Sequence, residues 1–251
     1  MTRKKWLIVL GVGIAVCMAM VAVVVVAAWC LFLGTGGVDR KLPVYTHDQT
    51  DSTHPGYRRS TITCGTSVYV NDYEEYALQL IDSEPTNAIG RAPFGNAKIC
   101  TIPGQSPADY LAADVGSEMP AYAVFRNSQH PPFDWRAATF QKMEFTWPNG
   151  SGAFQSTTDP ALIDDVIQAM KNGTPANPPP TASVGSRNLA GVHLYSDQLP
   201  GLKYCPEVYV NTAGPVYLAE NIAIEFTNQT TAVHANWIVA GPLFAKWVQA
   251  H

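Results

Sequence analysis

The sequence has few charged residues and no excess of basic ones. Only 14% of its 251 residues are charged, and 16 Lys and Arg stand against 20 Asp and Glu, a formal net charge of -4. Nucleic-acid binding depends largely on Lys and Arg side chains that displace phosphate counterions, so this composition excludes DNA and RNA as expected partners. Hydrophobic residues make up 47% of the chain, which is too apolar for a disordered protein and predicts a folded core.

The sequence also lacks every short motif that names a reaction. It holds no zinc-protease motif, no Cys-x-x-Cys pair and no phosphate-binding glycine loop. The segment Gly150-Ser151-Gly152 is expected in a hairpin and does not have the Gly-x-Ser-x-Gly form of a serine nucleophile. The sequence therefore assigns no catalytic, metal-binding or cofactor-binding residue and no cofactor, although a site assembled from distant residues would leave no local trace.

Charged residues are absent between Trp6 and Leu33, an apolar run longer than the roughly 20 residues that a helix needs to cross a bilayer. The basic residues 3–5 precede this run, and Lys and Arg stay on the cytoplasmic side of a membrane. A cleaved signal peptide has a shorter apolar region of about 7–15 residues, and a lipoprotein anchor at Cys30 is disfavoured by the bulky Trp29 before it. We therefore expect a single-pass protein of the plasma membrane, with a cytoplasmic N-terminus and an extracytoplasmic C-terminal domain.

Composition divides the chain into a cytoplasmic tail at 1–5, a transmembrane helix at 6–33, an extracytoplasmic linker at 34–59 and an extracytoplasmic domain at 60–251. After the tail, 13 basic residues stand against 20 acidic ones, a net charge of -7. An acidic domain has no electrostatic attraction to anionic headgroups, so contact with membrane lipid is expected through helix 6–33 alone. Another membrane or envelope protein is the expected partner.

Three of the five cysteines lie outside the apolar run, where an extracytoplasmic compartment would let a disulfide persist. We expect a bridge between Cys64 and Cys100, because both lie in strand-like stretches near the start of the domain. Cys205 remains, followed by Pro206 between apolar residues, and it is expected to be a buried small hydrophobe. The alternative is a reactive thiol, for which only Lys203 lies close enough in sequence to lower the pKa.

Short β-branched and aromatic runs broken by turn residues predict strands throughout the domain. The predicted strands are 61–70, 97–102, 119–126, 140–147, 152–156, 189–195, 207–211, 216–219, 222–227 and 233–240. The clearest predicted hairpin turns at Asn149-Gly150, since this pair adopts the left-handed dihedrals of a tight turn. The 172–187 segment, which contains three consecutive prolines, has no packing pattern and predicts a mobile loop.

Helices have fewer signals. Asp159 and Pro160 provide a cap and an opening proline for an amphipathic helix over 159–171. Further helices are predicted over 106–114 and 242–250, and 73–81 fits a helix or a strand equally well. The predicted fold class is α+β: a mostly antiparallel sheet with two or three short helices, preceded by one transmembrane helix.

Candidate ligands and bases are scattered along the chain. The densest group is His47, Asp48, Asp51 and His54, which have the chemistry of transition-metal ligands. A polar linker supplies no rigid surroundings for a metal, so these side chains are expected to be solvated. Aromatic residues form 10% of the chain and are expected to be spread over strands; a ring-lined groove for carbohydrate or peptide is the alternative.

Two functional hypotheses remain. The first is a non-enzymatic, membrane-tethered binding or accessory module that holds a ligand or partner through its sheet or its 172–187 loop. The alternative is an envelope hydrolase or metalloenzyme using His193 and His234, if strand pairing brings them together with Glu207 or Glu225.

Three segments form a strand-turn-helix pattern. They are Ile99-Cys100-Thr101-Ile102-Pro103-Gly104, Ser106-Pro107-Ala108-Asp109-Tyr110-Leu111 and Thr158-Asp159-Pro160. In this pattern the chain resembles, over residues 60–248, uncharacterised membrane-anchored extracytoplasmic proteins of Gram-positive bacteria. The resemblance implies a location and no activity, and it supplies no functional residue.

Overall fold

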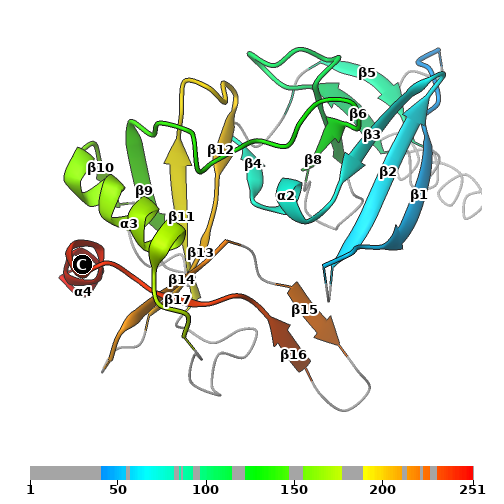
Figure 1. Ribbon diagram of the computed structural model, residues 1–251. Helices are drawn as coiled ribbons and strands as arrows, with labels where there is room; N and C mark the ends of the chain where they lie inside the picture. Colours follow the sequence, from blue (N-terminus) through cyan, green and yellow to red (C-terminus); the bar gives the residue numbers. More distant parts are fainter. Residues whose placement is uncertain are drawn as a thin grey trace, which may run out of the picture. The chain divides into compact units, whose positions relative to one another are not determined.

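The computed structural model divides the chain into two compact units, Met1–Leu42 and Pro43–His251. It describes residues 41–250 apart from 55–56, 82–84, 86, 93–96, 115–121, 147–154, 177–188, 211–213, 221–222 and 227–230. The architecture of the second unit is mostly antiparallel β-sheet (Figure 1).

A seven-stranded sheet is formed by the first part of this unit. Its strands, in spatial order, are β1 (Thr46–Asp51), β2 (Arg58–Cys64), β3 (Ser67–Asn71), β8 (Tyr122–Asn127), β7 (Tyr110–Asp114), β6 (Lys98–Thr101) and β5 (Ala88–Arg91). All neighbouring pairs are antiparallel. The short helix α2 (Tyr73–Tyr76) follows β3 directly.

This sheet curls until its two edges approach each other. The residues just before β1 reach the opposite edge, where Val44 bridges Arg91 and the Tyr45 amide donates to the Arg91 carbonyl at 2.8 Å. Gly90 allows this closure, because a Cβ at that position would overlap the Tyr45 ring. The enclosed side chains, Ile62 and Leu111 among them, form one of the buried cores.

The second sheet holds β10 (Gln155–Thr157), β9 (Lys142–Thr146), β11 (Leu189–Tyr195), β13 (Glu207–Val210), β14 (Val216–Ala219) and β17 (Ile238–Val239) in that order, with β12 (Leu202–Tyr204) pairing both β11 and β4 (Leu78–Leu80). A two-stranded ribbon of β15 (Ala223–Phe226) and β16 (Thr231–His234) stands apart from it in the pairing. The predicted hairpin is confirmed in its strands, since β9 and β10 pair antiparallel.

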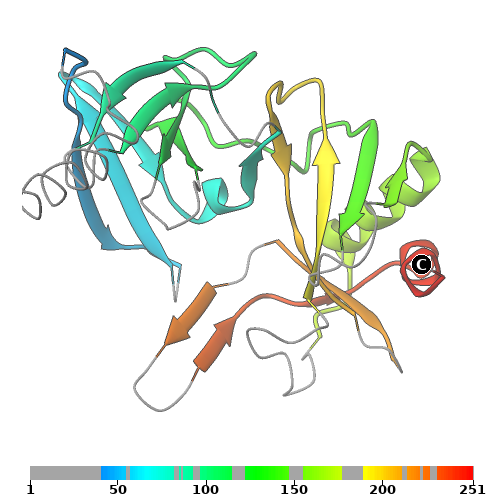
Figure 2. The ribbon, with the colours of Figure 1, turned by 180° about the vertical axis from the view of Figure 1, so that it is seen from behind.

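Helices α3 (Pro160–Asn172) and α4 (Pro242–Gln249) cover one face of the second sheet. Figures 1 and 2 agree on this, because α3 lies in front of the strands in one view and behind them in the other. The inward residues alternate along β9 and β11, so Phe145 and Val192 meet Ile163 and Phe244 in the main core. The opposite face of these strands, called here the outer face, carries the intervening polar residues.

The predicted helices at 159–171 and 242–250 are confirmed as α3 and α4. The capping signal at the start of α3 is real, since Asp159 Oδ1 accepts from the Ala161 amide at 3.0 Å. The predicted helix at 106–114 is wrong: a turn, closed by the Asp109 amide on the Ser106 carbonyl at 2.9 Å, leads into β7. Residues of β7 are buried on both faces between β6 and β8, which no single helical stripe would achieve.

The α+β fold class is therefore corrected to a mostly antiparallel β architecture with one curled sheet. Segment 73–81 resolves into α2 followed by β4, and residues 46–51, inside the segment expected to be a linker, form β1. More of the chain is strand than periodicity indicated, because pairing partners far away in sequence stabilise short segments.

The predicted transmembrane helix and single-pass plasma-membrane location are also corrected. Across the described residues, no helix combines the length and the apolar character needed to span a bilayer. The longest described helix, α3, has 13 residues and carries Asp164 and Asp165, whereas a span needs roughly 20 apolar residues. The run 6–33, on which both expectations rested, lies outside the described residues.

Candidate functional site

A buried ion pair fixes helix α2 against the curled sheet. Arg126 Nε of β8 donates to Glu75 Oε1 at 2.5 Å, and only 1% of the Glu75 side chain is exposed. Glu75 also accepts from the Asp72 amide at 3.0 Å, which completes a capping box at the start of α2. Burial raises the pKa of Glu75, and the Arg126 guanidinium opposes that rise. The helix is thus held by contacts 51 residues apart in sequence.

The rings that α2 presents pack against rings from the β1–β2 connection. His54 stacks on Tyr73 with centroids 4.1 Å apart, and Tyr57 meets the edges of Tyr73 and Tyr76 at 5.0 and 5.3 Å. Tyr76 is 43% exposed, and its hydroxyl donates to the Arg58 carbonyl at 3.0 Å. We call His54, Tyr57, Tyr73 and Tyr76 the tyrosine cluster.

A second group of residues, the carboxylate corner, comprises Trp135, Arg136, Tyr204 and Glu220. Glu220 accepts from Trp135 Nε1 at 2.7 Å and from Arg136 Nη2 at 3.5 Å. The Arg136 guanidinium lies 4.2 Å from the Trp135 ring centroid, and Trp135 stacks on Tyr204 at 5.7 Å. The Glu220 carboxylate therefore contacts an indole and a guanidinium, and a phenol stacks on that indole.

The charge of Glu220, in the carboxylate corner, affects the pKa values of tyrosines in the tyrosine cluster. Burial and then the charge of Glu220 raise the pKa of Tyr73 to about 12, against the opposing charge of Arg136. Burial and then the Glu220 charge also raise the pKa of Tyr204. Tyr57 is shifted upward by burial, by Tyr73, and by Glu207 and Glu220, so its pKa is raised as well. The three phenols share one acidic environment.

Two hydroxyl groups of this site have no hydrogen-bond partner in the part of the chain that the structure describes. They are Tyr57 Oη and Tyr204 Oη, on residues that are only 7% and 2% exposed. Buried polar atoms are almost always satisfied in native proteins. An orphaned pair beside a carboxylate therefore points to a ligand or ordered solvent as the missing partner.

The outer face of the second sheet holds a different polar arrangement, the outer polar row. Tyr195 Oη donates to Glu144 Oε2 at 2.5 Å, and Lys142 Nζ lies 2.6 Å from Glu144 Oε1. Burial raises the pKa of Glu144, but the hydrogen bonds from Lys142 and Tyr195 outweigh it, and the net shift is downward. Lys203 Nζ lies 3.4 Å from His193 Nδ1. Burial and then Lys203 lower the pKa of His193 to about 4, so the imidazole is neutral at pH 7.

The predicted pair of His193 and His234 is not assembled on one sheet. His193 lies in β11 opposite Glu144, whereas His234 lies in β16 and pairs through its backbone with Ala223 of the two-stranded ribbon. Glu207 lies opposite Gly191, two residues along β11 from His193, and burial raises the pKa of Glu207. Glu225 lies in β15, on the ribbon with His234. Lys203 Nζ lies 3.4 Å from His193 Nδ1, and its positive charge would oppose a metal ion at that nitrogen.

The dense group of potential metal ligands near the start is also divided. His47, Asp48 and Asp51 lie on the edge strand β1, while His54 stacks in the tyrosine cluster. Across the described residues, no group of three or more His, Cys, Asp and Glu is arranged to hold a metal ion.

The three described cysteines are all thiols, so the predicted Cys64–Cys100 bridge is not formed in the structure. The geometry explains this, because the two side chains face opposite sides of the curled sheet. Cys64 packs with Ile62 and Leu111 inside the curl, whereas Cys100 packs into the main core. Cys205 is buried as predicted, and burial raises the pKa of its thiol to about 12.

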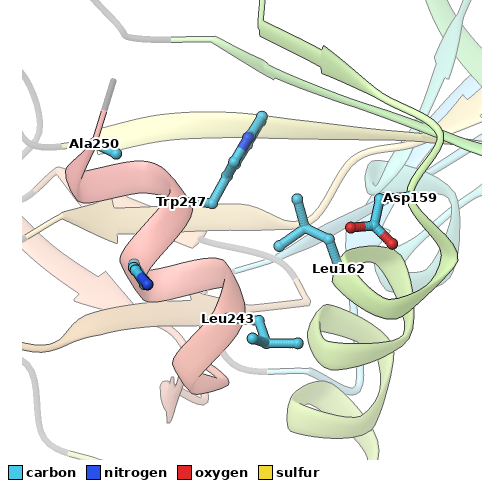
Figure 3. Close-up of a pocket in the computed structure, with 6 residues that line it drawn as sticks. Asp159, Leu162, Leu243, Trp247 and Ala250 are labelled. Carbon is cyan, nitrogen blue, oxygen red and sulfur yellow. The ribbon is translucent and has the colours of Figure 1, made fainter.

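A shallow groove of about 300 Å³ runs between α3 and α4 (Figure 3). Its lining residues are Asp159, Leu162, Leu243, Lys246, Trp247 and Ala250. Leu243 and Leu162 point toward each other across the groove, with Asp159 at the start of α3 beside Leu162. Two opposite charges on a small apolar surface give this groove no chemistry beyond packing.

The tyrosine cluster is not predicted by the sequence, whose aromatic residues were expected to be spread over strands. The available signal was the density of tyrosines at 57, 73 and 76, but nothing local indicated that Trp135 and Glu220 join them. Of the 172–187 loop, residues 177–187 lie outside the described residues, and Pro175 bridges Ile238. Comparisons with protein-family models, with curated proteins and with solved structures return no match, so the resemblance to membrane-anchored proteins stays a prediction.

Proposed function

We propose that the protein is a non-enzymatic binding module whose recognition surface is the tyrosine cluster with the carboxylate corner. The observation that carries this proposal is the packing of the four rings of the tyrosine cluster against one another, with Tyr76 exposed at the edge. Tyr, Trp and Arg dominate the binding energy of protein interfaces, because they bury large areas at low entropic cost.

Preorganisation supports a binding role for this surface. The rings of α2 are held by the buried Glu75–Arg126 pair and by the Asp72 capping box. Ser52 Oγ donates to Asp72 Oδ1 and accepts from the His54 amide at 3.1 Å, which connects the cap to the stacked imidazole. A surface that is already ordered loses little conformational entropy when a partner binds.

An enzymatic role has less support. In the outer polar row, the Glu144 carboxylate is already engaged by Lys142 and Tyr195, and Lys203 lies at Nδ1 of His193. These contacts occupy the Glu144 carboxylate and place a cation at the imidazole, which disfavours the use of the two groups as an acid–base pair.

The test is peptide selection against the purified protein, with 12-residue random peptides displayed on phage and the enriched sequences remade as synthetic peptides. Tyr76→Ala and Tyr73→Ala should each weaken the selected peptides by roughly tenfold or more, as expected for aromatic anchors. Leu243→Ala, in the groove between α3 and α4, is the matched control for an exposed apolar side chain and should leave affinity unchanged. Selected peptides that tolerate both tyrosine substitutions would contradict the proposal.

A further inference from the structure

We propose that the tyrosine cluster and the carboxylate corner recognise a cationic side chain, with arginine in an extended basic peptide as the ligand; this inference rests on the proposed binding function. Three independent features support it: the sign of the charge around the rings, the two orphaned hydroxyls, and the position of Arg136.

Carboxylates outnumber cations among the charges that act on the rings. Glu220 and Glu207 act on Tyr57, Glu220 and Glu74 act on Tyr73, and Asp72 acts on Tyr76, while the opposing cations are Arg136 at Tyr73 and Arg58 at Tyr76. After the basic residues 3–5, the chain as a whole carries a net charge of -7. An anionic or carbonyl-rich ligand would meet this field as repulsion, whereas a cation would gain from the carboxylates and the ring faces together.

The orphaned hydroxyls fit a donor-rich ligand. Tyr57 Oη and Tyr204 Oη have no partner among the described residues and are more than nine-tenths buried. Each hydroxyl oxygen has lone pairs that accept hydrogen bonds, and a guanidinium offers five N–H donors and no acceptor. A guanidinium therefore has more donors to offer these two oxygens and the Glu220 carboxylate than an ammonium, which has three.

Arg136 already makes the contacts that an arginine of the ligand would make. Its guanidinium lies on the Trp135 ring at 4.2 Å and reaches Glu220 at 3.5 Å. The pair is long and 59% of the Arg136 side chain is exposed, so the contact is weak and can be exchanged. An arginine from a partner would compete with Arg136 for the same carboxylate and ring, or bind beside it against Tyr73.

The experiment uses fluorescein-labelled peptides of the form (Arg-Gly)4, with (Lys-Gly)4, (citrulline-Gly)4 and (Glu-Gly)4 as comparisons, and fluorescence anisotropy in 150 mM salt. Citrulline keeps the shape of arginine and removes its charge, and this salt screens charges beyond about 8 Å. We expect the arginine peptide to bind at least tenfold more tightly than the citrulline peptide and several-fold more tightly than the lysine peptide. Equal binding of the arginine and citrulline peptides would overturn the inference.

Substitutions test whether binding of the arginine peptide depends on the carboxylate corner. Glu220→Gln keeps an oxygen for Trp135 Nε1 but removes the charge, and it should weaken the arginine peptide about tenfold. Asp164→Asn makes the same charge change on the exposed face of α3 and should have no effect. Arg136→Gln should tighten binding about two- to fivefold, because it removes the competing guanidinium. Equal losses in Glu220→Gln and Asp164→Asn would show nonspecific attraction to an acidic protein and overturn the inference.

The two proposals fail differently. If the arginine peptide does not bind but phage-selected peptides depend on Tyr73 and Tyr76, the cationic ligand is wrong and the binding function stands. If no peptide of either kind depends on these tyrosines, both proposals are wrong. Thermal melting of each variant, matched to the unsubstituted protein, establishes that a loss of binding is not a loss of fold.

Discussion

The tyrosine cluster with its carboxylate corner and the outer polar row are built from the same residue types, yet they differ in how their polar atoms are satisfied. In the outer row, the Tyr195 hydroxyl donates to Glu144, Lys142 pairs with the same carboxylate, and Lys203 reaches His193. In the cluster and corner, Tyr57 Oη and Tyr204 Oη have no partner among the described residues. A completed network stabilises a sheet, whereas an incomplete one beside the partly buried Glu220 carboxylate is suited to recognition.

The difference extends to how the two regions are held. The outer polar row lies on three neighbouring strands, and the backbone pairing of β9, β11 and β12 determines its geometry. The tyrosine cluster depends on the four-residue helix α2 and on the β1–β2 connection. The Glu75–Arg126 pair holds α2 against the curled sheet. The order of the region proposed for binding therefore rests on one buried ion pair and the Asp72 capping box, and not on strand pairing.

The largest expected effect comes from breaking that contact. Glu75→Ala leaves the buried Arg126 guanidinium without its carboxylate, although Nη1 still donates to the Asn127 and His130 carbonyls, and we expect the free energy of unfolding to fall by about 3–5 kcal/mol. Urea denaturation followed by circular dichroism measures the change. Glu74→Ala, at the exposed neighbouring position, is the control and should cost less than about 0.5 kcal/mol. Similar stability of the two variants would show that α2 is held by other contacts.

A matched pair of hydroxyl deletions tests the comparison directly. Tyr195→Phe removes a hydrogen bond to a carboxylate and should cost about 1.5–3 kcal/mol of unfolding free energy. Tyr57→Phe removes a buried hydroxyl that has no partner among the described residues, and its effect on unfolding should be neutral or slightly stabilising. The urea midpoints of the two variants measure both changes in the free energy of unfolding. A substantial loss of stability in Tyr57→Phe would show that its hydroxyl is already satisfied by ordered solvent.

The effect that is smallest at pH 7 is a pH dependence from His193. Its folded pKa is about 4 against 6.5 for an unfolded histidine, so the unfolded chain binds the proton more readily. This residue should therefore lower stability as pH falls from about 6.5 to about 4, and contribute no further change below that. The difference in urea midpoint between wild type and His193→Gln across this range isolates the effect from the carboxylates. Parallel curves for the two proteins would contradict the assignment.

Local signals predicted part of this fold correctly. Asp159 and Pro160 specify the start of α3, and the pairing of β9 with β10 follows from the hairpin expected around Asn149-Gly150. The same kind of signal at Ser106-Pro107 produced only a turn, because Tyr110 and Leu111 gain more by burial on both faces of a central strand. Capping and turn chemistry act over about four residues, so they were reliable only where long-range pairing did not compete.

The candidate site could not be predicted from sequence signals that act over a few residues. His54 and Tyr73 stack across 19 positions, Arg126 meets Glu75 across 51, and Trp135 meets Glu220 across 85. The expected pairing of Cys64 with Cys100 failed for a related reason, since sheet pleating sends the two side chains to opposite faces. Proximity along the chain or similarity of setting does not determine which face a side chain occupies.

By itself the sequence determined the acidic charge, the two longer helices, the buried position of Cys205 and the short-strand texture of the second unit, because these depend on composition and on neighbours a few residues apart. Only the tertiary structure decided the curl of the first sheet, the separation of His193 from His234 and the meeting of rings with Glu220. Those outcomes depend on strand register and on contacts between distant segments, and no periodicity in the chain encodes them.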